Sequence, residues 1–328
     1  MKSFAYIVCW DDVHYNVIDN IEKQFIDYGQ PHKIINSGNM KRDHWDNVGD
    51  IRYYRQFYKA LKEFDQSNDY MIFICGDVSC DNWSGVLDRM DKVLTVNTNV
   101  SVYAPHFTND PWNEGSTMLK RTDDENLIIS TNTNGIMYAL HKDIVKFMLE
   151  YMEYLDNKND LSTMVSGWGI DVVWSAYAMY LNKVVLRDSK ILVTHPAGSS
   201  YNHGKATQET ISVMQSFSEF AKIKGLDVAR IDALSNKING RMARDPNCMS
   251  ILDFYESEPK LVTPINIDYH VIYINDERIN NRDMIDSLVS GTRQNIKSLN
   301  AKDPSLLSEF YIDNPEFRVS IQPKLGEI

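Results

Sequence analysis

A carboxylate follows a markedly apolar stretch in the first part of the chain. The run YMIFIC at residues 70–75 breaks into Gly76 and Asp77, and a second acid, Asp81, comes four residues later. An Asp directly after a strand can be a turn residue, because its side chain bonds nearby backbone groups. It can also hold a divalent cation, because such ions prefer carboxylate oxygens. The spacing alone leaves both interpretations open.

Three further side chains stand where elements are expected to begin or end. Asp171 follows Gly-Trp-Gly-Ile at the start of a predicted helix, where a carboxylate can cap free N–H groups. Held in that direction, it could also accept a proton. Trp168 offers an apolar face on which a sugar ring or a base could stack, with core packing as the alternative. His195 precedes Pro196 at the end of a predicted strand and is either structural or a ligand.

Alternating strand and helix patterns must position these residues. Residues 4–10 and 70–75 are short β-rich apolar runs, and HKIINSG is a strand that enters a turn. The two stretches between these strands repeat apolar residues at helix spacing. Strand, helix, strand, helix, strand predicts right-handed crossovers and a parallel sheet, whose ligands bind beyond the carboxyl ends of the strands. The polar loops CWDD, NSGN and CGDVSCD should therefore meet at one site.

The rest of the chain predicts more strands and then a change in character. Residues 127–155 give a strand, a turn at Asn134 and Gly135, a second strand and a helix. GWGID opens a helix that is followed by strands ending at His195. Helices are expected near 207–244, and HVIYIN in the tail is a predicted strand. We therefore expect two domains, residues 1–204 and 205–328.

In this order the elements resemble a glycosyltransferase of the GT-A fold, of the broad family-2 type, over roughly residues 4–203. WDNVGDIRYYRQFYKALKEFDQSNDYMIFICGD resembles the turn, helix and strand before the metal-binding Asp motif of that family. NGIMYALHKDIV is similar to its donor-sugar hairpin. GWGIDVVWSAYAMYLNKVVLRDSKILVTHP resembles its Gly-Glu-Asp helix and the strand that ends on a metal-binding His. The resemblance implies an α/β fold: a Rossmann-like, mixed, mostly parallel sheet flanked by helices, with a largely helical C-terminal extension.

The resemblance also implies roles for the residues named above. A nucleotide-sugar donor, such as a UDP-sugar, leaves as a diphosphate whose charge Mn²⁺ or Mg²⁺ can neutralise. Asp77 and His195 would hold that metal, and Asp81 could add a ligand through water. Asp171 would be the general base that takes a proton from an acceptor hydroxyl. The family motifs are thinned here, because Asp77 lacks an adjacent acid and Ile170 replaces the Glu. A non-catalytic nucleotide-sugar-binding protein is therefore the alternative of another class.

The nucleotide-sugar itself is expected to lie against residues at strand ends and turns. Each is also a plausible turn residue. They are Asp11, Asp12, Asn36, Asn47, Asn134, Gly135 and Trp168.

A patterned charge feature in the tail bears on the acceptor. In GLDVARIDALSNKINGRMARDP the basic residues Arg230, Lys237, Arg241 and Arg244 fall on one helical face, with a separate apolar stripe. The apolar stripe should dock and the basic one face outward, where it could follow a phosphate backbone or simply be solvated. This is similar to DNA-modifying glycosyltransferases of tailed phages, and the resemblance implies hydroxymethylcytosine in double-stranded DNA as the acceptor. The rival acceptor is a cell-surface glycan or a protein.

Composition limits the setting of this activity. The net charge of −11 argues against general attraction to nucleic acid or anionic membrane, and so favours the rival acceptor. The basic stripe and the lack of a membrane segment favour DNA, which is the acceptor that we expect. No apolar run is long enough to span a bilayer, and the first residues do not form a signal peptide. Four cysteines without a CxxC pair indicate reduced thiols. We therefore expect a cytoplasmic protein, in the host cell if it is viral.

Overall fold

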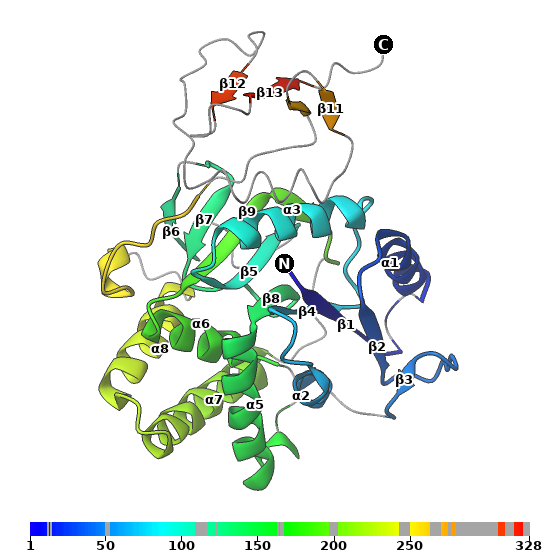
Figure 1. The fold of residues 1–328 in the computed structure, drawn as a ribbon. Helices are drawn as coiled ribbons and strands as arrows, with labels where there is room; N and C mark the ends of the chain where they lie inside the picture. The colour runs from blue at the N-terminus through cyan, green and yellow to red at the C-terminus, as the bar shows by residue number, and fades with distance from the viewer. Residues whose placement is uncertain are drawn as a thin grey trace. The chain divides into compact units, whose positions relative to one another are not determined.

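The computed structural model describes residues 1–11, 13, 15–49, 53–108, 117–122, 124–162, 164, 167–196, 203–242 and 250–262, and four strands beyond residue 269. The chain divides into two compact units, Met1–Thr263 and Pro264–Ile328. The division does not coincide with the composition change near residue 205, because the helices that follow this change pack within the first unit (Figure 1).

The first unit is built on a sheet whose nine described strands lie in the order β3-β2-β1-β4-β8-β5-β9-β7-β6. Their bounds are β1 (Ser3–Cys9), β2 (His32–Asn36), β3 (Asp46–Asn47), β4 (Tyr70–Cys75), β5 (Val100–Phe107), β6 (Met118–Arg121), β7 (Leu127–Ser130), β8 (Met137–His141) and β9 (Val184–Val193). β1 pairs in parallel with β2 and β4, as predicted, whereas β8 is antiparallel to both neighbours. The predicted α/β class with a mixed sheet is confirmed.

β4 illustrates why these runs form central strands. All six of its residues are buried, and they are apolar or aromatic on both faces. A strand covered on both sides needs no polar alternation, so it appears in the sequence as a continuous apolar run. Gly76 then ends the strand with its N–H on the Val8 carbonyl, at 2.8 Å. A Cβ at Gly76 would lie 2.7 Å from that same carbonyl oxygen, so the turn into Asp77 requires glycine.

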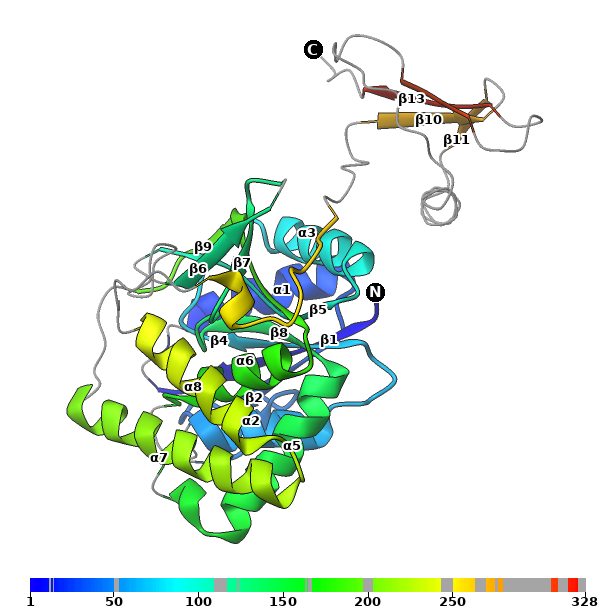
Figure 2. The same cartoon turned by 90° about the vertical axis from the view of Figure 1, so that its left-hand side faces the viewer.

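Helices cover both faces of this sheet. In Figure 2, α1 and α3 lie on one face, and α2, α5 and α6 on the other, with α7 and α8 packed outside α6. Their bounds are α1 (Tyr15–Tyr28), α2 (Tyr53–Glu63), α3 (Trp83–Val96), α5 (Lys142–Asn157), α6 (Ile170–Tyr180), α7 (His203–Ile223) and α8 (Val228–Met242), with short 3₁₀ turns at Asp160–Ser162 and Ile251–Asp253. Because α6 is enclosed between the sheet and these outer helices, nearly all of its side chains are buried. This explains why its sequence is apolar all round.

The second unit contains a small antiparallel sheet in the order β11-β10-β13-β12. The strands are β10 (His270–Ile274), β11 (Glu277–Ile279), β12 (Ser308–Tyr311) and β13 (Arg318–Pro323). β10 confirms the strand predicted at HVIYIN. The helical part of the C-terminal extension is thus α7 and α8, and the described elements beyond residue 269 are strands.

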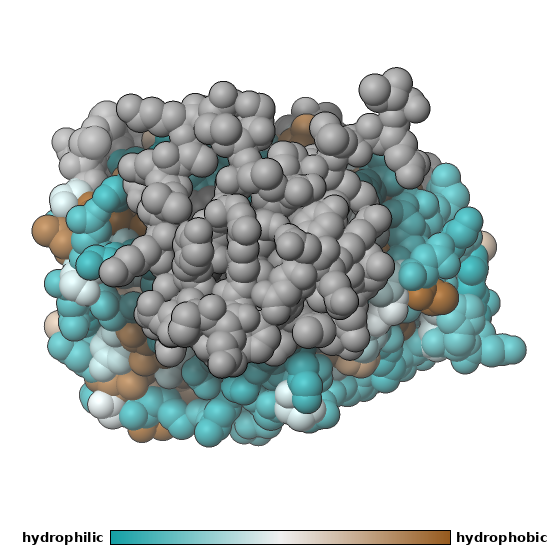
Figure 3. All heavy atoms as spheres, turned by 45° about the horizontal axis from the view of Figure 1, so that its top comes forward, coloured by the Kyte–Doolittle hydropathy of each residue, from teal (hydrophilic) through white to brown (hydrophobic). Residues whose placement is uncertain are grey.

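The surface, the helices and the cysteines were compared over the described residues. The coloured surface in Figure 3 is mostly hydrophilic, with apolar side chains in small groups. Among the described residues, no helix has the length and apolar character needed to cross a membrane. Cys9, Cys75 and Cys80 are free thiols, and Cys248 lies outside the described residues.

Candidate functional site

The ends of β4 and β9 bring Asp77 and His195 together. Ser79 and Thr194, just beyond these strands, form an antiparallel bridge with N–H···O distances of 2.9 and 2.8 Å. This bridge fixes the two loops side by side. As a result, His195 Nε2 lies 3.5 Å from Asp77 Oδ2. The two side chains that the resemblance assigns to one metal are therefore neighbours, although they are 118 positions apart in the sequence.

The Asp77 carboxylate has capacity for a further ligand. Its Oδ1 atom is buried and has no hydrogen-bond partner among the described residues. Buried polar atoms in folded proteins are nearly always paired, so an orphaned carboxylate oxygen needs an explanation. The side chain as a whole is 27% exposed, and that of His195 is 22% exposed, so the pair is accessible. One carboxylate and one imidazole form a donor set that Mn²⁺ or Mg²⁺ can use when phosphate oxygens and water complete it.

Asp81 does not join this pair directly. It is exposed and precedes Asn82, the N-cap of α3. The described residues contain no group of three potential metal ligands, at this place or elsewhere. A role for Asp81 through water stays a prediction.

Asp171 lies in the first turn of α6 and is held from two sides. The Val172 N–H donates to its Oδ1 at 3.0 Å, and Asn132 Nδ2 donates to its Oδ2 at 2.6 Å. The N-cap itself is Gly169, with φ of 88° and no side-chain cap. Asp171 thus satisfies one helix N–H without being the N-cap, and the capping and base interpretations remain compatible.

Burial changes the proton affinity of this carboxylate. Asp171 is only 9% exposed. Desolvation raises its pKa above the ordinary value, and the hydrogen bonds from Asn132 and from backbone N–H groups oppose that rise. A carboxylate with a raised pKa is a stronger base than an ordinary Asp, which suits the removal of a proton from a hydroxyl near neutral pH.

The turn before Asp171 is tied to two helices. Tyr54 of α2 donates its hydroxyl to the Trp168 carbonyl at 2.8 Å, and the Gly167 N–H donates to Glu209 of α7 at 3.0 Å. Trp168 is partly exposed, as a stacking surface would require. Its contact with a sugar or a base stays a prediction.

The loop between β7 and β8 differs from the predicted hairpin. β7 and β8 do not pair, because β9 and β5 lie between them in the sheet. Asn134 has a left-handed φ of 67°, and its N–H donates to Asn132 Oδ1 at 3.0 Å. Tyr53 donates to the Gly135 carbonyl at 2.8 Å. Since the next residue, Ile136, accepts the Cys75 N–H at 2.8 Å, this loop lies beside the end of β4 that leads to Asp77.

Asn36 and Asn47 have structural partners. Asn36 is fully buried, and its amide nitrogen donates to the Met40 carbonyl and to Asn47 Oδ1 at 2.5 and 2.8 Å. Its Oδ1 accepts from the Gly38 N–H at 2.9 Å. Asn47 in turn donates to the Arg42 and Trp45 carbonyls. These amides shape the loop after β2, and their direct contact with the nucleotide stays a prediction.

Asp11 orders the same region from the end of β1. It is exposed, and its two oxygens accept from the backbone and side-chain N–H groups of Asn39, at 2.5 and 2.6 Å. The carboxyl ends of β1 and β2 therefore meet, as the parallel pattern predicted. Asp12 lies outside the described residues.

The basic face of α8 is directed toward the protein. Arg230 pairs with Glu256 at 3.5 Å, Lys237 donates to the Asp253 carbonyl at 3.2 Å, and Arg241 donates to the Met118 carbonyl at 2.7 Å. These three residues of the basic stripe are therefore partly exposed and bound to other groups of the chain, and their contact with an acceptor stays a prediction.

The remaining parts of that prediction have separate outcomes. Arg244 lies outside the described residues. The apolar stripe does dock, since Ile231, Leu234 and Ile238 are buried.

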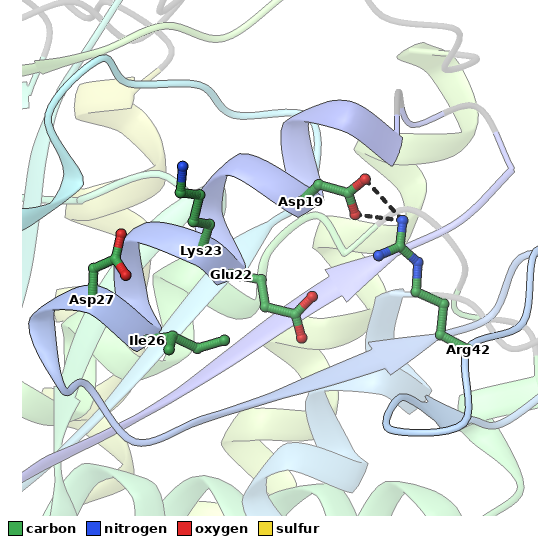
Figure 4. A pocket seen from close by; sticks show the side chains of 6 residues that line it. All are labelled: Asp19, Glu22, Lys23, Ile26, Asp27 and Arg42. Atoms are coloured by element: carbon green, nitrogen blue, oxygen red, sulfur yellow. Dashed lines mark hydrogen bonds and ion pairs between the residues drawn. The ribbon is translucent and has the colours of Figure 1, made fainter.

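A surface pocket on α1 contains none of the predicted site residues. Figure 4 shows that an ion pair between Arg42 and Asp19, at 2.6 Å, lies at one side of it. Its lining residues are Asp19, Glu22, Lys23, Ile26, Asp27 and Arg42. Exposed charges of this kind are ordinary surface features, and we assign no function to the pocket.

Asn132 is a functional candidate that the sequence does not reveal. The stretch STNTNG has the composition of a turn, and nothing in it distinguishes the asparagine that bonds Asp171 from its neighbours. The pairing joins residues 39 positions apart, so only the fold reveals it.

Comparison with known proteins gives a partial likeness of fold. No family model and no curated protein matches the sequence. The structure is similar to GalNAc-T7 with UDP, GalNAc and Mn²⁺ (TM-score 0.45, 10% identity, 73% of this chain and 55% of that one). It is also similar to a glycosyltransferase involved in glycosylation of the major capsid of PBCV-1 (TM-score 0.38, 11% identity, 63% of this chain and 99% of that one). A third similar structure is the catalytic domain of Drosophila beta1,4galactosyltransferase 7 complexed with xylobiose (TM-score 0.31, 11% identity, 63% of this chain and 80% of that one).

These likenesses cover 63–73% of this chain. The chain spans about half the length of the GalNAc-T7 structure. At 10–11% identity and TM-scores below 0.5, they do not extend to activity. The mixed α/β fold of the chain is established by its own sheet and helices.

Proposed function

We propose that the chain is a glycosyltransferase that moves a sugar from a nucleotide-sugar, a UDP-sugar being the first to test, to an acceptor hydroxyl. The observation that carries the proposal is the Asp77–His195 pair with its orphaned carboxylate oxygen. Asp77 and His195 would hold Mn²⁺ or Mg²⁺. When bound, the ion would neutralise charge on the departing diphosphate.

Other groups of the protein have distinct tasks in the proposed reaction. Asp171 accepts the proton of the acceptor hydroxyl as the oxygen attacks the sugar carbon. Asn134 and Gly135 lie on the loop beside β4, where the donor sugar would bind. Trp168 offers its exposed part as an apolar surface for a sugar or base.

For the acceptor we propose a hydroxyl of a glycan or protein rather than duplex DNA. The described basic residues of α8 bind groups of the chain itself, and the net charge is −11. Both features weaken attraction to a phosphate backbone. The acceptor test is transfer from labelled donor to a panel that includes glycans, proteins and hydroxymethylcytosine-containing duplex. Transfer to the duplex alone would contradict this assignment.

The metal and donor parts are tested by thermal unfolding with UDP-sugars, with and without Mn²⁺. A ligand that binds the folded state raises Tm with its concentration. We expect the donor-dependent rise to need the metal and to be lost in Asp77→Asn, because an amide is a weaker ligand than a carboxylate. The matched control is Asp91→Asn, which removes a carboxylate of α3 that pairs with the N-terminus.

Three outcomes separate the alternatives. Loss of the metal-dependent rise in Asp77→Asn but not in Asp91→Asn supports the site. An unchanged rise in Asp77→Asn, or in excess EDTA, would remove the metal from the proposal. A donor that binds with metal but is neither transferred nor hydrolysed would favour the non-catalytic nucleotide-sugar-binding protein.

A further inference from the structure

We propose that Asn132 is a positioning residue, whose side-chain amide fixes the Asp171 carboxylate and ties it to the loop that the donor sugar would contact. This inference rests on the proposed function for its catalytic meaning. Its structural core is one buried amide that joins the β7–β8 loop to the first turn of α6.

The amide is fixed because both of its ends are used. Asn132 is 1% exposed. Its Nδ2 donates to Asp171 Oδ2 at 2.6 Å, while its Oδ1 accepts the Asn134 N–H at 3.0 Å. Turning the amide over would place its oxygen against a carboxylate oxygen and its NH₂ group against an N–H. The orientation that donates to Asp171 is therefore the stable one.

The same contacts define the direction of the carboxylate. Asn132 holds Oδ2, and the Val172 N–H holds Oδ1 at 3.0 Å. Two donors from different elements leave the Asp171 side chain little freedom to rotate. Since Asn132 also holds Asn134, a shift of the donor loop would move the amide that orients the base. Loop and base are thus linked through one side chain.

The surroundings of Asp171 make the Asn132 amide important for the ionised form of this carboxylate. The titratable groups facing Asp171 are Tyr53 and Tyr54 of α2 and Tyr138 of β8, whose pKa values burial raises well above normal. They stay neutral over the working range. Glu209 of α7 adds a further acid near Tyr54. The groups that lower the pKa of Asp171 are hydrogen-bond donors, led by Asn132.

The test compares two substitutions that remove the donor in different ways. Asn132→Leu removes donor and acceptor, whereas Asn132→Asp keeps the shape and the acceptor for Asn134 but loses the amide donor and adds an acid. We expect both to lower kcat about tenfold or more, and to move the acid limb of the kcat/KM profile upward by about one pH unit, more for Asp. The matched control is Asn97→Leu, a buried asparagine that bonds Val93 and Val262. It should leave the limb in place.

A second measurement does not depend on activity. The pKa of Asp171 is raised in the folded protein, so its contribution to stability is present at low pH and is lost as pH rises from the ordinary value of 3.8 through the raised one. Asn132→Leu should extend that loss to higher pH. With Asp171→Asn as the second mutation, a cycle of Tm against pH should show a coupling between the two positions that grows as pH rises through this window.

The outcomes keep the two proposals apart. A coupling that grows with pH, together with a shifted acid limb, supports the positioning role. A rate loss equal at all pH values, with no pH-dependent coupling, would overturn it and leave Asn132 as an ordinary buried residue. If no nucleotide-sugar is used by the wild type but the coupling is present, the proposed function fails while the link between Asn132 and Asp171 stands.

Discussion

At the scale of single residues, burial of the Asp171 carboxylate costs stability, whereas in the proposed reaction it would make the group a better base. Removing a charged group from water costs free energy unless hydrogen bonds compensate. Here burial raises the pKa in spite of several donors. A group kept in this condition is a candidate for function, because perturbed carboxylates gather at functional sites.

We predict that Asp171→Asn lowers kcat by about 10²–10⁴-fold with donor affinity nearly unchanged. Proton removal matters only as the hydroxyl attacks, so the ground state with donor should be unaffected. Stability relative to the wild type should rise as pH increases above 3.8, because the variant no longer buries a charge. Kinetics and thermal unfolding at several pH values check this. A parallel loss of stability and rate would instead assign Asp171 to the helix turn, and an unaffected rate would remove it from the mechanism.

At the scale of elements, the sequence of α8 predicts its two stripes but not the segments that contact the basic one. The 3.6-residue period identified both stripes, and the apolar one is buried. The basic face meets Asp253 and Glu256, which come later in the chain. Periodicity places residues on a face, but it does not say which segment will cover that face.

We predict that Arg241→Ala lowers the free energy of unfolding by about 1.5–3 kcal/mol, because it removes a charged donor from the Met118 carbonyl. Any salt-dependent binding to DNA should stay unchanged. Urea unfolding and DNA titrations at two salt concentrations measure both. Lys222→Ala on the exposed side of α7 is the control, expected within about 0.5 kcal/mol of the wild type. A stable variant that has lost salt-dependent DNA binding would restore the phosphate-tracking interpretation.

Elements that pair with near neighbours in the sequence were predictable, whereas elements that pair with distant strands were not. β1, β2 and β4 were predictable because each is a short apolar run between amphipathic helices, and local order fixes their parallel pairing. The approach of Asp77 to His195 was expected only from the resemblance. β7 and β8 look like a hairpin in sequence, yet each pairs with distant strands. Long-range pairing of this kind leaves no local signal.

At the scale of the whole molecule, the core of the first unit extends past the composition change near residue 205. Phe217 of α7 and Ile238 of α8 are fully buried, and Phe254 and Tyr255 are almost so. All belong to the cluster that includes the sheet. α6 is apolar on every side and depends on α7 and α8 to cover it.

We predict that residues 1–263 unfold in one cooperative transition and retain metal-dependent stabilisation by the donor, whereas residues 1–204 do not fold. The longer fragment keeps every element of the first compact unit. The shorter one exposes the outer side of α6 and loses the Glu209 contact to the turn before Asp171. Burial of apolar surface contributes roughly 25 cal/mol per Å² to stability. The free energy lost by exposing a whole helix face therefore exceeds the free energy of unfolding of an ordinary domain. Circular dichroism melts of both fragments, followed by donor titration with Mn²⁺, decide the matter. Cooperative folding of residues 1–204 would show that α7 and α8 form a separate extension, as the composition change suggested.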